Sequence, residues 1–345
     1  MSERKHHLRK VHNRSNKTID LAFLSVIMVL AIVLRLWQLG DVFFALIGTC
    51  SVYLIYDIGR QWFNRKVGLF SGAFFAVSQF TVTCTALPQI IGLFCVLLTA
   101  WFWSKIVYGT KKNKVGVYVG MALSIWACSA VHLCAFAQAV LVFLTGLFFL
   151  PKERYKSYCI SGIPSIFLAI PTLLFVSPIL FPIGDHNARL NVPTATFLTD
   201  FLQFSMNDSS LFMFATGIII LLPLILSKRD KSRNPLRWVG IAWFAIIFSI
   251  AFAYSLFCEP ILQYSTLIFS YPFLIMAAFS LFKNRTLSPW QNALVVAVIL
   301  FVGTSSLVFN PNKPVETNEK TATIQQTNFP TSKNCLFLRP KSIDL

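Results

Sequence analysis

Long apolar stretches alternate with short polar loops along most of this 345-residue chain. A helix needs about 20 apolar residues to cross a bilayer core of roughly 30 Å. The apolarity is continuous within each stretch, whereas the strands of a membrane β-barrel alternate between apolar and polar residues. We therefore expect an all-α, polytopic membrane helical bundle of about eleven transmembrane helices, over residues 19–37, 42–59, 67–83, 89–108, 115–130, 133–150, 158–181, 210–226, 238–257, 262–282 and 289–309. The segment 115–150 could instead be one kinked helix with a re-entrant piece.

The positions of Lys and Arg predict the orientation of this bundle. Basic residues are concentrated in segment 1–18 and in every second loop after it. Cytoplasmic loops carry the excess of Lys and Arg, so the N-terminus should be cytoplasmic and the C-terminus outside. This divides the chain into a basic cytoplasmic N-terminus (1–18), a transmembrane domain (19–309) and a polar outer tail (310–345). In a bacterium the location would be the inner membrane. Arg35 lies near an outer helix end, where we expect it to snorkel to the surface.

Composition and the placement of charged and Cys residues argue against a nucleic-acid-binding protein and against a disulfide-rich or zinc-binding protein. The chain is 56% hydrophobic and has a formal net charge of +17, but its charges are spaced between apolar stretches rather than gathered on one domain. No nucleic-acid partner is therefore expected; the expected partners include membrane lipids. The 8 Cys residues form no CxxC pair, so neither a disulfide framework nor a zinc site is predicted. The first apolar stretch is not followed by a cleavage site of small residues such as A-x-A, so we expect no cleavable signal peptide.

Polar residues in the outward loops are the candidates for chemistry. Asp41 could be a general base or a metal ligand, or it could cap the helix that begins at Val42. His132 could hydrogen-bond a phosphate or satisfy a helix terminus. In the loop 182–209, Arg189 could bind a phosphate with two donors or pair with Asp185.

The dipeptide Asp185-His186 resembles part of a metal site but has no third ligand at a fixed spacing. We predict no cofactor and no metal site, and leave a divalent metal requirement open.

Several segments resemble one family of membrane enzymes. The segment Leu34-Arg35-Leu36-Trp37-Gln38-Leu39-Gly40, the turn Ala130-Val131-His132 and the run from Glu259 to Leu274 are similar to motifs of polyprenyl-phosphate-sugar-dependent glycosyltransferases. These C-type-fold enzymes include the protein O-mannosyltransferases (glycosyltransferase family 39) and the lipid A aminoarabinose transferase. The resemblance implies a polyprenyl-phosphate-linked sugar as donor and an acceptor lipid, glycan or protein. It implies that His132, Asp185, His186 and Arg189 contact the substrate or its lipid phosphate, and that Gln263 contacts the sugar.

The chain also departs from the family pattern. The first outer loop is reduced to residues 38–41, and Asp41 is followed by Val42 rather than by Glu. Residues 85–89 lack the Arg and Tyr that the family carries in that turn. A non-catalytic relative that binds a lipid phosphate or joins a membrane complex is therefore the alternative to an enzyme. A transporter is a third reading, although charge within the spans is sparse and no internal repeat is evident.

Overall fold

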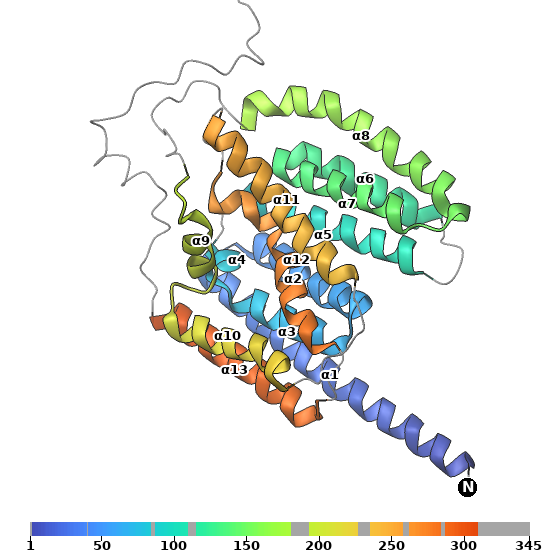
Figure 1. The fold of residues 1–345 in the computed structure, drawn as a ribbon, viewed down its shortest axis with the longest axis vertical. Helices are drawn as coiled ribbons and strands as arrows, with labels where there is room; N and C mark the ends of the chain where they lie inside the picture. Colours follow the sequence, from blue (N-terminus) through green and yellow to red (C-terminus); the bar gives the residue numbers. More distant parts are fainter. Residues whose placement is uncertain are drawn as a thin grey trace, which may run out of the picture.

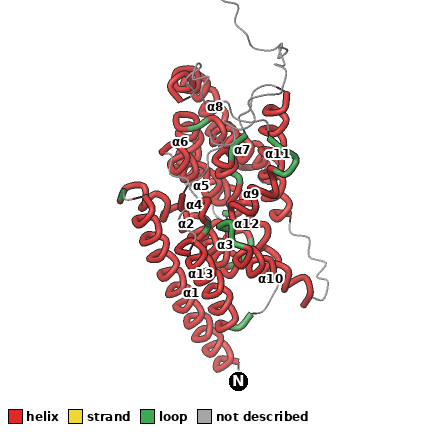
Figure 2. The backbone as a smooth tube through the Cα atoms, turned by 90° about the vertical axis from the view of Figure 1, so that its left-hand side faces the viewer, coloured by secondary structure: helices red, strands yellow, loops and turns green. Residues whose placement is uncertain are grey.

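The computed structural model describes residues 2–39, 41–83, 87–109, 115–180, 193–226, 235–257, 262–283 and 287–309. Within these residues the chain forms helices and turns and no strand, as Figure 2 shows. The helices are α1 (Ser2–Leu39), α2 (Val42–Trp62), α3 (Arg65–Val77), α4 (Gln79–Thr83), α5 (Leu87–Tyr108), α6 (Val115–Val131), α7 (Leu133–Phe149), α8 (Lys152–Leu180), α9 (Phe197–Ser205), α10 (Ser210–Leu226), α11 (Pro235–Phe257), α12 (Tyr271–Phe279) and α13 (Pro289–Phe309), with the short 3₁₀ helices η1 (Tyr264–Phe269) and η2 (Ser280–Phe282).

Each predicted apolar stretch is helical, and two of them are broken. The stretch 67–83 is divided into α3 and α4 at Ser78, and the stretch 262–282 into η1, α12 and η2. The segment 115–150 forms two helices, α6 and α7, which meet at His132 and pack against each other. An all-α polytopic bundle is thus confirmed.

Five helices are long and apolar enough to cross a membrane: Ile19–Trp37, Val42–Trp62, Pro88–Tyr108, Pro235–Phe257 and Pro289–Phe309. A sixth span is formed if α9 and α10, which meet at an angle of 92°, are taken together. The total of eleven spans stays a prediction.

The helices pack in a stack, with α2, α3 and α12 at its centre (Figure 1). Helices α5, α6, α7 and α8 lie on one side of this centre, and α1, α10 and α13 lie on the other. Helix α1 continues beyond the bundle toward the N-terminus, so the basic segment that precedes Ile19 is part of a helix that also packs on α2 and α3.

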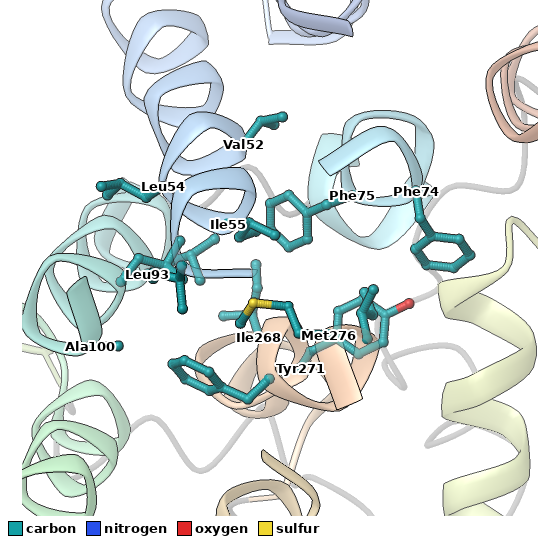
Figure 3. Close-up of a cluster of buried hydrophobic side chains, with 14 of the residues drawn as sticks. Val52, Leu54, Ile55, Phe74, Phe75, Leu93, Ala100, Ile268, Tyr271 and Met276 are labelled. Carbon is teal, nitrogen blue, oxygen red and sulfur yellow. The ribbon is translucent and has the colours of Figure 1, made fainter. Parts of the chain in front are cut away.

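Large apolar side chains fill the centre of the stack. Val52 and Ile55 of α2, Phe75 of α3, and Tyr271 and Met276 of α12 converge there (Figure 3), and none of them is more than 2% exposed. Within lipid, helix association depends on close packing of this kind more than on exclusion of water.

Three tryptophans form a second cluster, near the end of the bundle that should face the cytoplasm. The ring centroids of Trp62 (α2), Trp103 (α5) and Trp243 (α11) are 5.4 to 5.6 Å apart. Phe273 of α12 stacks on Trp62 at 6.0 Å. The Trp62 indole also donates a hydrogen bond of 2.6 Å to Ser104 Oγ. These rings join four helices at one point.

Candidate outer site

Three of the predicted site residues stand at the start of a helix, and the other three, Asp185, His186 and Arg189, lie outside the described residues. Asp41 is the N-cap of α2: its Oδ1 accepts hydrogen bonds from the backbone N–H groups of Phe43 (2.8 Å) and Phe44 (3.4 Å). The capping alternative is therefore what the geometry shows. The second carboxylate oxygen, Oδ2, accepts no hydrogen bond within the described part of the chain, so the base role stays a prediction.

His132 is the N-cap of α7. Its Nδ1 accepts a hydrogen bond of 3.1 Å from the backbone N–H of Cys134, which requires that Nδ1 carry no proton. Its ring centroid lies 4.9 Å from that of Phe269. Burial lowers the pKa of His132, which favours this neutral form. The helix-terminus alternative is thus observed, and contact with a phosphate stays a prediction.

Helix η1 connects His132 with Gln263. Gln263 is the residue before η1, and its side-chain Oε1 accepts a hydrogen bond of 3.0 Å from Ser265 Oγ. Phe269, which contacts the His132 ring, is the last residue of η1. Six residues of 3₁₀ helix span about 12 Å. The structure therefore places these two predicted site residues at opposite ends of one short element, although they are far apart in the sequence.

An aromatic surface with two carboxylates lies beside Gln263. The ring of Tyr264 stacks on Phe204 at 5.3 Å and lies 5.1 Å from Phe197, both on α9. The carboxylates of Asp200 and Asp208 are close enough to act electrostatically on the Tyr264 hydroxyl. Amide, hydroxyl and carboxylate groups thus gather around η1, and such groups can hydrogen-bond the hydroxyls of a polar ligand.

Asn207 fixes this region to the core of the bundle. It is fully buried, with a positive φ of 64°, and it lies between α9 and α10. Its Oδ1 accepts from the backbone N–H of Gln79, and its Nδ2 contacts Val77 O (3.0 Å), Gly303 O (3.1 Å) and Ser306 Oγ (2.7 Å). One amide thereby satisfies backbone groups freed by the break between α3 and α4, which lipid could not satisfy.

Ser78, at that break, completes the attachment by donating a hydrogen bond of 2.6 Å to Ser205 O. The next residue after Asn207, Asp208, also has a positive φ, of 49°. The polar contacts of the α3–α4 break therefore set where the Asp208 carboxylate is placed relative to η1.

The expectation for Arg35 was wrong. Its side chain does not snorkel: the residue is 1% exposed and lies inside the bundle. Its Nη1 donates a hydrogen bond of 3.2 Å to Ala31 O, while Nη2 is buried and has no hydrogen-bond partner among the described residues. A guanidinium stays charged in proteins, and burying an unpaired charge costs several kcal/mol. The signal in the sequence was a charge inside an apolar stretch, which by default indicates function rather than a route to the surface.

The described residues contain no group of three or more His, Cys, Asp or Glu side chains placed to hold a metal ion. The polar groups described at this end of the bundle include amides, hydroxyls, carboxylates and the guanidinium of Arg35. A carboxylate there can accept a proton from a hydroxyl, and a buried guanidinium can hold an anion.

Residues 23–181 match the family model of dolichyl-phosphate-mannose-protein mannosyltransferases. This region runs from α1 through the end of α8. No curated protein and no solved structure matches the chain. The matched region covers less than half of the chain, and it contains Arg35, Asp41 and His132. This part of the chain is therefore similar to a family of membrane glycosyltransferases, the broad class expected from its motifs.

Proposed function

We propose that this protein is a multi-pass membrane glycosyltransferase that transfers a sugar from a polyprenyl-phosphate donor to an acceptor on the outer face. The observation that carries the proposal is the similarity of residues 23–181 to the mannosyltransferase family. The polar groups around η1 support it, because they lie at the end of the bundle where the charge pattern predicts the outer face.

In the proposed reaction, the acceptor hydroxyl oxygen attacks the anomeric carbon, its proton passes to a carboxylate, and the polyprenyl phosphate leaves with the electrons of the broken bond. We assign the proton-accepting role to Asp41, whose Oδ2 is not used by the cap. His132, Asp185, His186 and Arg189 are proposed to contact the donor, and Gln263 the sugar. A positioned base contributes about 100-fold to 10,000-fold to rate.

Purified protein in lipid nanodiscs, given polyprenyl-phosphate mannose, glucose and aminoarabinose in turn, tests the activity. Asp41→Asn separates the two roles of Asp41, because Asn is an equally good N-cap but cannot accept the proton. We expect Asp41→Asn to lower kcat at least about 100-fold and to leave thermal stability unchanged. Asp41→Ala should lower both kcat and thermal stability. Unchanged turnover in Asp41→Asn removes Asp41 as the base.

Asp200→Asn, in α9, and Asp208→Asn, between α9 and α10, are the matched comparisons for the other two carboxylates. Asn tolerates the positive φ of 49° at residue 208, so this change removes the charge without straining the backbone. A loss of turnover in one of these two variants alone would assign the base to that carboxylate. Absence of transfer and hydrolysis with every donor would refute the transferase.

A specific observation favours a second candidate, a non-catalytic relative that binds a lipid phosphate. The first outer loop, which is reduced relative to the family pattern, consists only of Gly40 and Asp41 between α1 and α2, and the Asp41 carboxylate caps α2. This candidate predicts binding of a polyprenyl phosphate without turnover, or co-purification with an active transferase. Neither result would be obtained from an enzyme that acts alone.

We also propose that the N-terminus faces the cytoplasm of a bacterial cell and that the membrane is the inner one. Reporter fusions at residue 2 and within 193–208 test the orientation. The two reporters should lie on opposite sides of the membrane. If both lie on the same side, the groups around η1 do not face the donor.

A further inference from the structure

We infer that Arg35 anchors a lipid-borne phosphate group between α1 and α2. The choice of ligand rests on the proposed function, whereas the anion site itself rests on the geometry of the described residues. The inference names a contact for the donor phosphate that is independent of His132 and Arg189.

Arg35 differs from the other arginines whose side chains the structure describes. Arg60 and Arg65 each pair with a carboxylate, that of Asp57 and that of Asp20. Arg154 donates to Ile106 O at 2.7 Å, and Arg237 donates to Ser280 through two nitrogens.

Arg35 is the most buried of these five side chains, and its one hydrogen bond within the described residues is to a carbonyl of its own helix. No carboxylate pairs with it there, and its Nη2 has no partner. A permanent cation held in this way is expected to take an anion from outside the chain.

The neighbouring helix is shaped to hold the guanidinium. Gly48 of α2 is buried opposite Arg35, and a Cβ atom at Gly48 would lie 2.6 Å from Arg35 Nε and 2.9 Å from Cδ. Any side chain at residue 48 would therefore push the guanidinium from its place. The absence of a side chain is what allows a long cationic side chain to lie inside the bundle.

The surroundings favour an anion that carries an apolar tail. On the side of α1 that faces away from the bundle, Val33 and Trp37 are 54% and 55% exposed. Helix α1 therefore presents an apolar face to lipid. Trp is enriched near the membrane–water interface, where lipid phosphates lie. A guanidinium has five N–H donors in a planar fork that matches phosphate oxygens. The described residues supply no carboxylate partner for Arg35, so an anion that pairs with it must come from outside them.

The test measures ligand-induced thermal stabilisation of the full chain in detergent micelles. Farnesyl phosphate is the probe, and farnesol, phosphatidylglycerol and inorganic phosphate are the comparisons. We expect farnesyl phosphate to raise the Tm of the unchanged protein by several degrees, and Arg35→Met to abolish this rise. The ligand-free Tm of Arg35→Met should equal or exceed that of the unchanged protein, because an unpaired buried charge has been replaced by an apolar side chain of similar length.

Arg237→Met is the matched control, because Arg237 is hydrogen-bonded to Ser280. It should keep the full farnesyl phosphate response. Gly48→Ala retains the charge but displaces the guanidinium, and it should weaken farnesyl phosphate binding at least threefold. This second variant keeps the inference testable if Arg35→Met does not fold.

Two results would overturn the inference. One is an unchanged response to farnesyl phosphate in both Arg35→Met and Gly48→Ala. The other is an equal response of the unchanged protein to farnesol or to inorganic phosphate alone, which would remove the phosphate or the lipid tail from the recognition. An Arg35-dependent response to phosphatidylglycerol as well would support the site and identify lipid headgroups as a source of its ligand.

Failure of the inference and failure of the proposed function give different results. Arg35-dependent binding without turnover of any sugar donor would refute the transferase and keep the anion site. Turnover with the same KM for the donor in the unchanged protein and in Arg35→Met would keep the transferase and refute the anion site.

Discussion

Replacement of Asn207 by Ala should be among the most destabilising single changes in the chain. The side chain is 0% exposed and contacts four polar groups on three segments: Gln79 N, Val77 O, Gly303 O and Ser306 Oγ. Nδ2 has two hydrogens, so three hydrogen bonds can exist at once. Polar contacts between membrane helices are worth about 0.6 kcal/mol on average, and buried hydrogen bonds in general about 1 kcal/mol.

Three such bonds therefore contribute about 2 to 3 kcal/mol. Ala at the positive φ of 64° adds roughly 1 kcal/mol of backbone strain that Asn largely avoids. The expected loss is about 3 to 4 kcal/mol in the free energy of unfolding. Equilibrium unfolding in mixed micelles of dodecylmaltoside and dodecyl sulfate measures it. Asn207→Gly should be roughly 1 kcal/mol less destabilising than Asn207→Ala, because Gly accepts the positive φ.

Asn292 supplies the control for this prediction. It is also buried, at 8% exposure, but its Oδ1 has no hydrogen-bond partner in the part of the chain that the structure describes. Asn292→Ala should therefore cost less than about 1 kcal/mol. If Asn207→Ala costs no more than Asn292→Ala, the hydrogen bonds of Asn207 do not hold the α3–α4 break, and the reasoning is refuted.

Two further changes test the packing and the capping of the helices. Gly146→Ala should lower the Tm or prevent folding, because a Cβ at this residue would overlap the Tyr158 hydroxyl. Gly217→Ala should be neutral or stabilising, because nothing lies within 4 Å of the Cβ position at this residue. Similar Tm values for the two variants would contradict the packing. Burial lowers the pKa of His132 in the folded protein, so its contribution to stability is complete above the unfolded pKa of about 6.5 and is lost as the pH falls below it. His132→Asn keeps a capping side chain without titration, so unfolding measured between pH 5 and 8 should depend less on pH; an identical pH profile would exclude His132 as the cause.

The sequence was sufficient to predict where the apolar helices are, but not α9 (Phe197–Ser205), which lies within the segment 182–209 that was predicted to be a loop. Residues 210–226 and 289–309 were predicted to be helical with the same bounds that the structure has. Length and continuous apolarity decide this, because a segment that cannot bond to water must satisfy its backbone internally.

The breaks within helices could not be predicted in the same way. Ser78 lies inside an apolar stretch whose composition is that of an unbroken span. The break is tolerated because Asn207, 128 positions or more away in the chain, satisfies the freed backbone groups. Local apolarity carries no information about such a distant partner.

The site was predictable as separate residues but not as an arrangement. Asp41 and His132 were each recognised with both of their roles, and the capping role is the one that geometry can show. That η1 links His132 to Gln263 depends on how α7 packs against a helix more than 100 residues later. Arg35 was misjudged because its burial depends on Gly48 of the next helix, and a rule based on distance from a helix end does not include the neighbour.

The three packed indoles give this protein an intrinsic optical signal of its folded state. Trp62, Trp103 and Trp243 come from helices distant in sequence, with ring centroids within 5.6 Å of one another. Aromatic circular dichroism in the near ultraviolet depends on fixed tertiary packing and disappears when packing is lost but helices remain. The near-ultraviolet spectrum, to which these three of the 8 Trp residues contribute, therefore reports loss of tertiary packing even in detergents that keep every helix intact, and every variant above can be checked by it without a label.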